Sequence, residues 1–188
     1  MSNVEIRPLS GLVEKHTFMF AMCLLFAMGC TTPNLRVLYK DNIKATGAIR
    51  NNGNAFYYSV CIGTDIFPYD GRQTFAIRLP SGTILSSDDF SEQAIRPIAL
   101  KLSETGDGTV RYNPERGSQI YFLEGVGFEY KDDQLITMKI SFHISHTKKY
   151  IPEISTTASG TFFPFPVSEK HLKEIFGPPD KTNDSRIW

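Results

Sequence analysis

The chain has 188 residues, and its 20 lysines and arginines balance its 20 aspartates and glutamates, so the formal net charge is zero. This balance argues against a nucleic-acid partner, because phosphate binding depends on clustered basic residues and the nearest approach here is the pair Lys148-Lys149. A chain of this size forms about one domain and buries enough surface for a hydrophobic core without disulfides.

The N-terminal region contains a short apolar segment that is preceded by basic residues. Lys15 and His16 precede the apolar run 18–28, which ends at Gly29 and Cys30. A membrane-spanning helix needs about 20 apolar residues, whereas the apolar core of an export signal has about 7–15. The segment therefore predicts a signal that is inserted and removed rather than a permanent span.

The segment from Ala27 to Cys30 resembles the lipobox of bacterial lipoproteins. The resemblance implies that residues 1–29 are a removed signal peptide and that the Cys30 thiol carries a diacylglycerol, with fatty acids such as palmitate holding the protein on a membrane. Thr31 stands where lipoproteins of the inner membrane have Asp, which implies the outer membrane and a domain facing the periplasm. The small residues Ala27 and Gly29 also suit the ordinary signal peptidase, so a soluble secreted or periplasmic protein is an alternative, as is a buried apolar helix in an uncleaved chain.

Cysteine usage is compatible with export. Cys61 is the one thiol that remains if Cys23 leaves with the signal and Cys30 is lipidated. It lies in an apolar run and is interpreted as a small buried hydrophobic residue. In a soluble secreted form, a disulfide between Cys30 and Cys61 is the alternative.

We predict a tether at residues 30–34 and a single β-rich domain at residues 35–177. Short runs rich in Ile, Val, Phe, Tyr and Thr alternate with Gly, Asn, Asp and Pro. We predict a mainly β fold, an antiparallel β-sandwich or barrel-like sheet with one C-terminal helix. The expected strands cover residues 35–39, 43–49, 55–62, 74–79, 98–102, 110–112, 119–123, 127–130, 135–145 and 161–165.

The sequence also contains signals for a turn and for a short helix between these strands. The segment 51–54, Asn-Asn-Gly-Asn, supplies residues that tolerate a positive φ and predicts a hairpin turn. Ser87 is a possible N-cap for a short helix through Gln93, but Pro97 argues against a long one.

The segment 127–145 contains the clearest hairpin. Residues 131–134 form its turn, and the long run that follows has apolar and polar residues in strict alternation, which is typical of a strand with one wet face. The apolar set is Ile136, Met138, Ile140, Phe142 and Ile144, and the polar set is Thr137, Lys139, Ser141, His143 and Ser145.

The C-terminal region predicts an edge strand and then a helix. Pro164 and Pro166 favour an edge position for 161–165, which we expect to be the last strand. Ser168 is a good N-cap, and the helix that follows has one apolar face and stops at Gly177. Its apolar residues are Leu172, Ile175 and Phe176. Residues 178–188 are expected to form a polar tail.

No set of catalytic or metal-binding residues stands out. His143 and His146 are three positions apart, and on a strand such residues point to opposite faces, so we predict no metal site. No serine occupies a nucleophile elbow, and no glycine loop has the pattern of a phosphate cradle. Most aspartates lie in turn contexts, where the side chain bonds its own backbone: Asp65, Asp70, Asp88, Asp89 and Asp107. The sequence therefore predicts no cofactor and no enzymatic activity.

Two aromatic clusters, at 56–58 and 162–165, are mostly explained by core packing, with a partly exposed recognition patch as the remaining interpretation. If a surface binds a protein partner, the expected residues are Tyr57, Tyr69, Arg72, Phe163 and Phe165. The leading hypothesis is a lipid-anchored envelope protein, an assembly accessory or immunity-type factor, that binds or inhibits a protein partner. The alternative is an envelope hydrolase or a glycan-binding module that uses Asp and Tyr on a concave sheet.

Overall fold

The computed structural model describes residues 34–40, 42–49, 53–64, 66, 68–144 and 149–184. They belong to one compact unit, Pro33–Trp188. The predicted signal peptide, Cys30 and nearly all of the tether lie outside the described residues. So do Asn51 and Asn52 of the predicted turn, Asp65, His146 and the last four residues.

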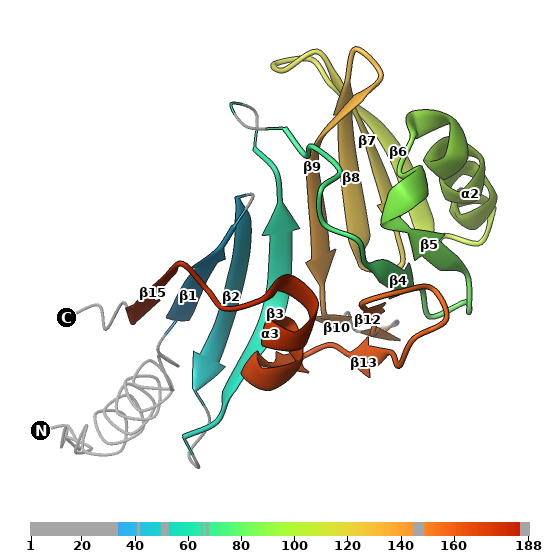
Figure 1. The fold of residues 1–188 in the computed structure, drawn as a ribbon. Helices are drawn as coiled ribbons and strands as arrows, with labels where there is room; N and C mark the ends of the chain where they lie inside the picture. The colour runs from blue at the N-terminus through green and yellow to red at the C-terminus, as the bar shows by residue number, and fades with distance from the viewer. Residues whose placement is uncertain are drawn as a thin grey trace, which may run out of the picture. The chain divides into compact units, whose positions relative to one another are not determined.

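A large antiparallel sheet forms one layer of the fold (Figure 1). Its path runs β15-β1-β2-β3-β9-β8-β7-β6, and the short strand β14 pairs with β3 beside that path. The strands are β1 (Asn34–Tyr39), β2 (Ile43–Ile49), β3 (Ala55–Ile62), β6 (Gly108–Asn113), β7 (Ser118–Leu123), β8 (Val126–Lys131), β9 (Gln134–Ser141), β14 (Val167–Ser168) and β15 (Lys181–Asp184).

The second layer covers one face of this sheet. It contains a four-stranded sheet in the order β13-β12-β4-β5, a 3₁₀ helix and two α-helices. Their bounds are β4 (Ala76–Arg78), β5 (Ile84–Ser86), β12 (Glu153–Ser155), β13 (Phe163–Pro164), η1 (Ser87–Asp89), α2 (Glu92–Glu104) and α3 (Glu169–Phe176). A further pair, β10 (His143–Ile144) and β11 (Lys149–Tyr150), follows β9. Both layers contribute to one buried apolar cluster, which confirms a mainly β, antiparallel and sandwich-like fold.

The hairpin β8–β9 confirms the sequence prediction. Asp132 and Asp133 form its two-residue turn, and both have positive φ (50° and 61°), the backbone that matches the twist of the flanking strands. On β9, Ile136, Met138 and Ile140 are buried, as the alternation requires. The hairpin therefore follows from local pattern alone.

Helix α3 also has the predicted ends and face. The Ser168 hydroxyl accepts a hydrogen bond from the His171 amide (3.3 Å), and the Gly177 amide donates to the Lys173 carbonyl (2.9 Å). The apolar face is buried, as predicted. Ser168 lies on β14, so the pairing of β14 with β3 places the start of α3 over the centre of the large sheet.

The prediction for residues 87–102 is wrong. Ser87 begins only the single turn η1, whereas α2 begins after Ser91, continues through Pro97 and replaces the expected strand 98–102. Pro97 removes one helical amide, but it lies on the exposed side of α2. The Ser91 N-cap (3.2 Å to the Ala94 amide) and the burial of Ile95 and Ala99 hold the helix. Packing against β6 and β7 thus outweighs the local proline signal.

The C-terminal end of the chain is more ordered than predicted. β13 lies at an edge of the four-stranded sheet, in agreement with its prolines, but it is not the last strand. The expected tail contains β15, which pairs with β1 from Leu35↔Asp184 to Leu38↔Lys181. The last described strand therefore closes the edge of the large sheet at which the first strand lies.

Aromatic rings connect the two layers. Phe75, at 1% exposure, contacts Phe90 and Phe176, each with ring centroids 5.6 Å apart. Phe90 in turn contacts Phe128 on β8, with centroids 5.4 Å apart. These contacts join the loop before β4, the segment before α2, the end of α3 and the large sheet.

Candidate functional site

Two of the predicted partner-binding residues are not on the surface. Tyr57 is 0% exposed and Phe165 is 1% exposed, so the prediction that they form a recognition patch is wrong. On β3 the side chains alternate, and Tyr57 points into the core while Phe56 and Tyr58 are partly exposed. Phe165 belongs to the same apolar cluster, where burial of an aromatic ring stabilises the fold.

The other three predicted residues are at least partly accessible. Phe163 is half-buried and stacks on His171, with ring centroids 3.8 Å apart. Tyr69 is also half-buried, and its hydroxyl donates to the Gln73 carbonyl (2.9 Å). Arg72 is exposed and pairs with Asp70 (2.8 Å). Each has a structural partner already.

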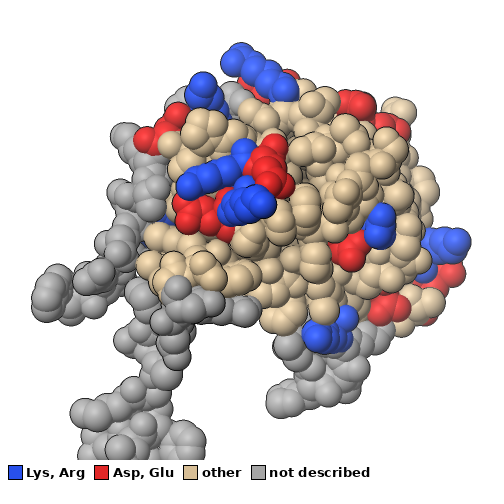
Figure 2. Space-filling model, turned by 60° about the horizontal axis from the view of Figure 1, so that its bottom comes forward, with Lys and Arg blue, Asp and Glu red and all other residues tan. Residues whose placement is uncertain are grey.

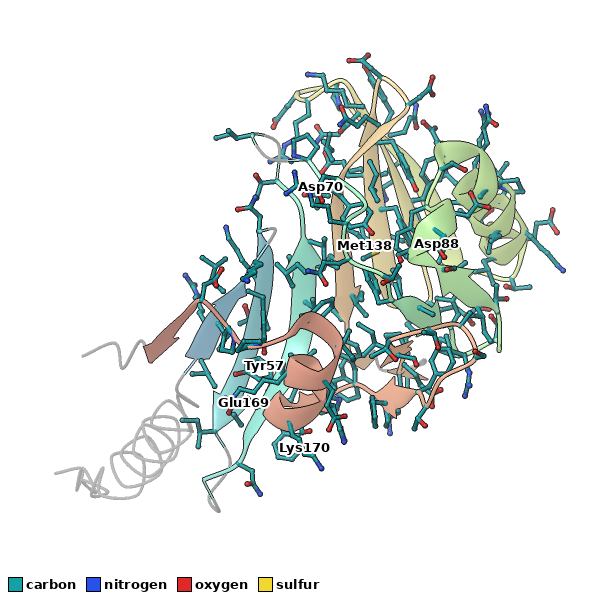
Figure 3. The ribbon with its side chains drawn as sticks, viewed as in Figure 1. Tyr57, Asp70, Asp88, Met138, Glu169 and Lys170 are labelled. Carbon is teal, nitrogen blue, oxygen red and sulfur yellow. The ribbon has the colours of Figure 1, made fainter. Side chains whose placement is uncertain are left out.

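These residues do not form one surface. Figure 3 shows Asp70, two residues before Arg72, at one end of the sheet, whereas Tyr57 lies at the other, beneath α3 and beside Glu169. The predicted patch is therefore divided between two regions of the domain. A candidate binding site has to be sought elsewhere.

The face of the large sheet that points away from the second layer, here called the outer face, presents a different set of residues. Strand register places one row of side chains across seven strands. The row consists of Thr109, Phe122, Gly127, Lys139, Cys61, Lys44 and Leu38. Side chains in one such row are cross-strand neighbours and lie about 5 Å apart.

A hollow of about 320 Å³, here called the glycine cleft, lies at the β6–β9 end of this row. Glycines make room for it. A Cβ atom on Gly127 would lie 3.1 Å from the ring of Phe122, so this ring lies across the glycine. Gly125 has φ +97° in the tight turn between β7 and β8, where an L side chain would be strained. Asp107, Glu124, Lys139, Ser141 and Tyr150 provide the polar side chains of the lining.

The carboxylates of the glycine cleft are held in place by hydrogen bonds. Asp107 accepts from the hydroxyl of Tyr150 (3.0 Å) and from that of Thr105 (2.8 Å). Glu124, which is 8% exposed, accepts from the backbone amide of Ser81 (3.0 Å). These bonds hold the wall of the cleft in place, because the Asp107 and Glu124 carboxylates each accept at least one hydrogen bond.

The remaining side chains of the glycine cleft are accessible. Lys139 is exposed and forms no ion pair among the described residues, and the Phe122 ring is 44% exposed. The Ser141 hydroxyl donates a hydrogen bond to the Gly125 carbonyl (3.3 Å), an arrangement that does not suit a nucleophile. The described lining includes no histidine or cysteine, and this arrangement is suited to holding a ligand by one cation, an aromatic ring and polar groups.

A second hollow, here called the basic groove, lies at the β1–β3 end of the outer face and measures about 370 Å³. Arg36, Lys44 and Thr46 are exposed along it, and Cys61 forms part of its floor. Cys61 is partly exposed rather than buried, which corrects the interpretation of it as a core residue. A disulfide with Cys30 lies outside the described residues.

The face shown in Figure 2 differs in charge pattern from the basic groove. There, basic and acidic side chains lie next to each other. On α3, Lys173 pairs with Glu169 (2.6 Å) and Lys170 approaches Glu174 (3.9 Å). Such exposed pairs neutralise the surface and contribute little to stability.

Among the described residues, the titratable groups with a clearly shifted pKa are five buried or half-buried tyrosines. Burial, followed by the charge of Glu169, raises the pKa of Tyr39 to about 12. Burial, followed by the hydrogen bond to Glu92, raises the pKa of Tyr121 to about 12. Burial is also the main cause of the raised pKa of Tyr57, Tyr69 and Tyr130. Among the described buried side chains, the hydroxyls of Tyr39 and Tyr57 have no hydrogen-bond partner.

Sequence reasoning did not identify the glycine cleft. The sequence places Asp107 in a turn context, and its glycine segments lack the pattern of a phosphate cradle, so neither feature predicts a binding site. A pair of glycines flanking one residue occurs twice, between α2 and β6 and at the turn between β7 and β8, and this repetition is the local signal that the sequence contains. The contribution of Tyr150 depends on tertiary structure and has no local signal.

No family model, curated protein or solved structure matches the chain. Within the described part of the chain, no helix has both the length and the apolar character of a membrane span. The same residues contain no cluster of three potential metal ligands of the His, Cys, Asp and Glu types.

Proposed function

We propose that this chain is a lipid-anchored bacterial envelope protein that binds or inhibits a protein partner in the periplasm without catalysing a reaction. The glycine cleft is its binding site. The observation that supports this proposal best is the composition of the cleft. Its lining combines the exposed Phe122 ring and the exposed Lys139 cation with two carboxylates that are held by hydrogen bonds. Aromatic rings are enriched in protein interfaces because they bury a large area at low entropic cost.

The anchor is tested by metabolic labelling with palmitate. The wild-type protein is expected to take up the label and the variant Cys30→Ser to take up none, because the thiol is the site of acylation. Mass spectrometry of the purified protein then locates the mature N-terminus. A protein whose N-terminus lies upstream of Cys30, or that carries no lipid, would contradict the proposal.

The binding site is tested by a photo-crosslinking amino acid at position 122 in cells. We expect a discrete crosslinked protein from this position and none from position 84, because Ile84 is similarly exposed (45%) but lies on β5 in the other layer. The variant Lys139→Glu is expected to reduce the crosslink several-fold by reversing the cation of the cleft. Equal crosslinking from both positions, or from neither, would argue against the cleft.

Glycan binding is a second candidate function, and one specific observation favours it. Asp107 and Glu124 line the same cleft as the exposed Phe122 ring. Sugar hydroxyls donate hydrogen bonds to carboxylates, and the apolar face of a sugar stacks on an aromatic ring. Both carboxylates already accept hydrogen bonds, so binding is better supported than hydrolysis. Co-sedimentation with purified cell-wall sacculi that is lost in Phe122→Ala would favour this candidate.

A further inference from the structure

We propose that the basic groove binds anionic phospholipid headgroups, so that the β1–β3 end of the outer face lies against the membrane that carries the anchor. This inference rests on the proposed lipid anchor at Cys30. It goes beyond the anchor because it assigns the domain an orientation on the bilayer.

The first observation is an uneven distribution of charge. Residues 34–62 contain Arg36, Lys40, Lys44 and Arg50 against Asp41, a net charge of +3 in a chain whose net charge is zero. Of these, Arg36, Lys40 and Lys44 are described and exposed, and none of the three forms an ion pair among the described residues. The described part of this segment therefore presents positive charge on its exposed side.

The second observation is the geometry of the groove. Lys44 is the cross-strand neighbour of both Cys61 and Leu38, and Arg36 is that of Thr46. The two cations thus flank a hydroxyl and a partly apolar floor in a hollow of about 370 Å³. Cations and hydroxyl donors are groups that bind phosphate oxygens, and each basic residue near an anionic bilayer raises the affinity about fivefold.

The third observation is the short connection to the anchor. Three residues separate Cys30 from Asn34, the first residue of β1, and an extended chain from Cys30 to Asn34 reaches at most about 14 Å. Arg36 follows two residues later. In the lipidated protein, β1 and the groove beside it are consequently held near the headgroups.

The glycine cleft stays accessible in this orientation. Neighbouring strands rotate by roughly 20–25°, so the four steps from β1 to β8 turn the outer face by roughly 80–100°. Figure 1 shows β1 and β2 at a clear angle to β8. The groove and the cleft therefore point in different directions, and one end of the face can lie on the membrane while the other binds a partner.

Cys61 is a built-in reporter for this arrangement. The purified lipidated protein is reconstituted into vesicles of phosphatidylcholine alone or with about one third phosphatidylglycerol, and labelling of Cys61 by a charged maleimide is followed by mass spectrometry. We expect labelling to be at least about fivefold slower on the anionic vesicles, and the difference to disappear in 0.5 M salt, because salt screens exposed charges.

Two matched double variants identify the cause. Arg36→Glu/Lys44→Glu is expected to abolish the protection, whereas Lys101→Glu/Lys131→Glu, with the same change in net charge on α2 and β8, is expected to retain it. Equal labelling on both kinds of vesicle, or equal protection on both, would overturn the proposal. Protection in native envelopes but not on pure vesicles would assign the groove to an acidic protein and would also overturn it.

The two proposals fail in different ways. If the lipid anchor is absent, the protein does not co-sediment with phosphatidylcholine vesicles, and after reduction Cys30 is labelled together with Cys61. If only the headgroup contact is absent, the protein co-sediments with both kinds of vesicle and Cys61 is labelled at the same rate on each.

Discussion

Replacing Phe75 with alanine is expected to lower the free energy of unfolding by about 3–5 kcal/mol, a large part of the 5–15 kcal/mol that typically holds a domain folded. Phe75 is 1% exposed, and its ring contacts Tyr69, Phe90 and Phe176. Removing the ring loses its burial and leaves a cavity between two layers that cannot fully collapse. Urea denaturation followed by circular dichroism measures the change.

Phe122→Ala is the matched control for this substitution. The same ring is removed, but Phe122 is 44% exposed and lies on the outer face, so the free energy of unfolding is expected to change by about 0.5 kcal/mol or less. Similar losses in the two variants would show that the ring at position 75 does not connect the layers as described.

Alkaline pH is expected to unfold the protein cooperatively between about pH 10 and 12. Five buried or half-buried tyrosines, Tyr39, Tyr57, Tyr69, Tyr121 and Tyr130, have a raised pKa in the folded state. Below pH 10 these phenols are protonated in both states and stability does not depend on them. Above pH 10 the unfolded chain loses their protons first, so stability falls by up to about 1.4 kcal/mol per pH unit for each group.

The measurement combines urea denaturation at several pH values with the ultraviolet absorbance of tyrosinate. At alkaline pH below the unfolding transition, tyrosinate absorbance is expected to be well below that of the same chain in denaturant at the same pH. Tyr57→Phe removes one buried phenol without removing a hydrogen bond, so it is expected to flatten the dependence on pH. Equal absorbance in the folded and unfolded states would contradict the burial of these hydroxyls.

The parts of the fold that the sequence predicts correctly are those governed by local rules. Three correctly predicted features depend on residues that are close together in sequence. They are the alternation in β9, the positive-φ turn at Asp132 and Asp133, and the Ser168 cap of α3. The sequence does not predict helix α2, because the run 98–102, which is apolar except for Lys101, suits a strand or a helix equally and Pro97 favours the strand. Burial of Ile95 and Ala99 against the sheet decides between them, and the sequence does not show that contact.

The candidate site was less predictable than the fold. The Asp107–Tyr150 hydrogen bond joins residues that are 43 positions apart, and the Phe122–Gly127–Lys139 row exists because three strands adopt one particular register. Tyr57 and Phe165 were expected at the surface because aromatic residues suit both cores and interfaces. The tertiary packing around each ring, which the sequence does not show, determines whether that ring lies in the core or in an interface.

The pairing of β15 with β1 has a consequence for the order of assembly. β15 follows all the other described strands in the chain, so β1 keeps one row of unpaired backbone groups until residues 181–184 have been synthesised. A chain emerging from a ribosome or a translocation channel therefore cannot finish this sheet early, and a truncation before Lys181 leaves the edge of β1 open to pairing between chains.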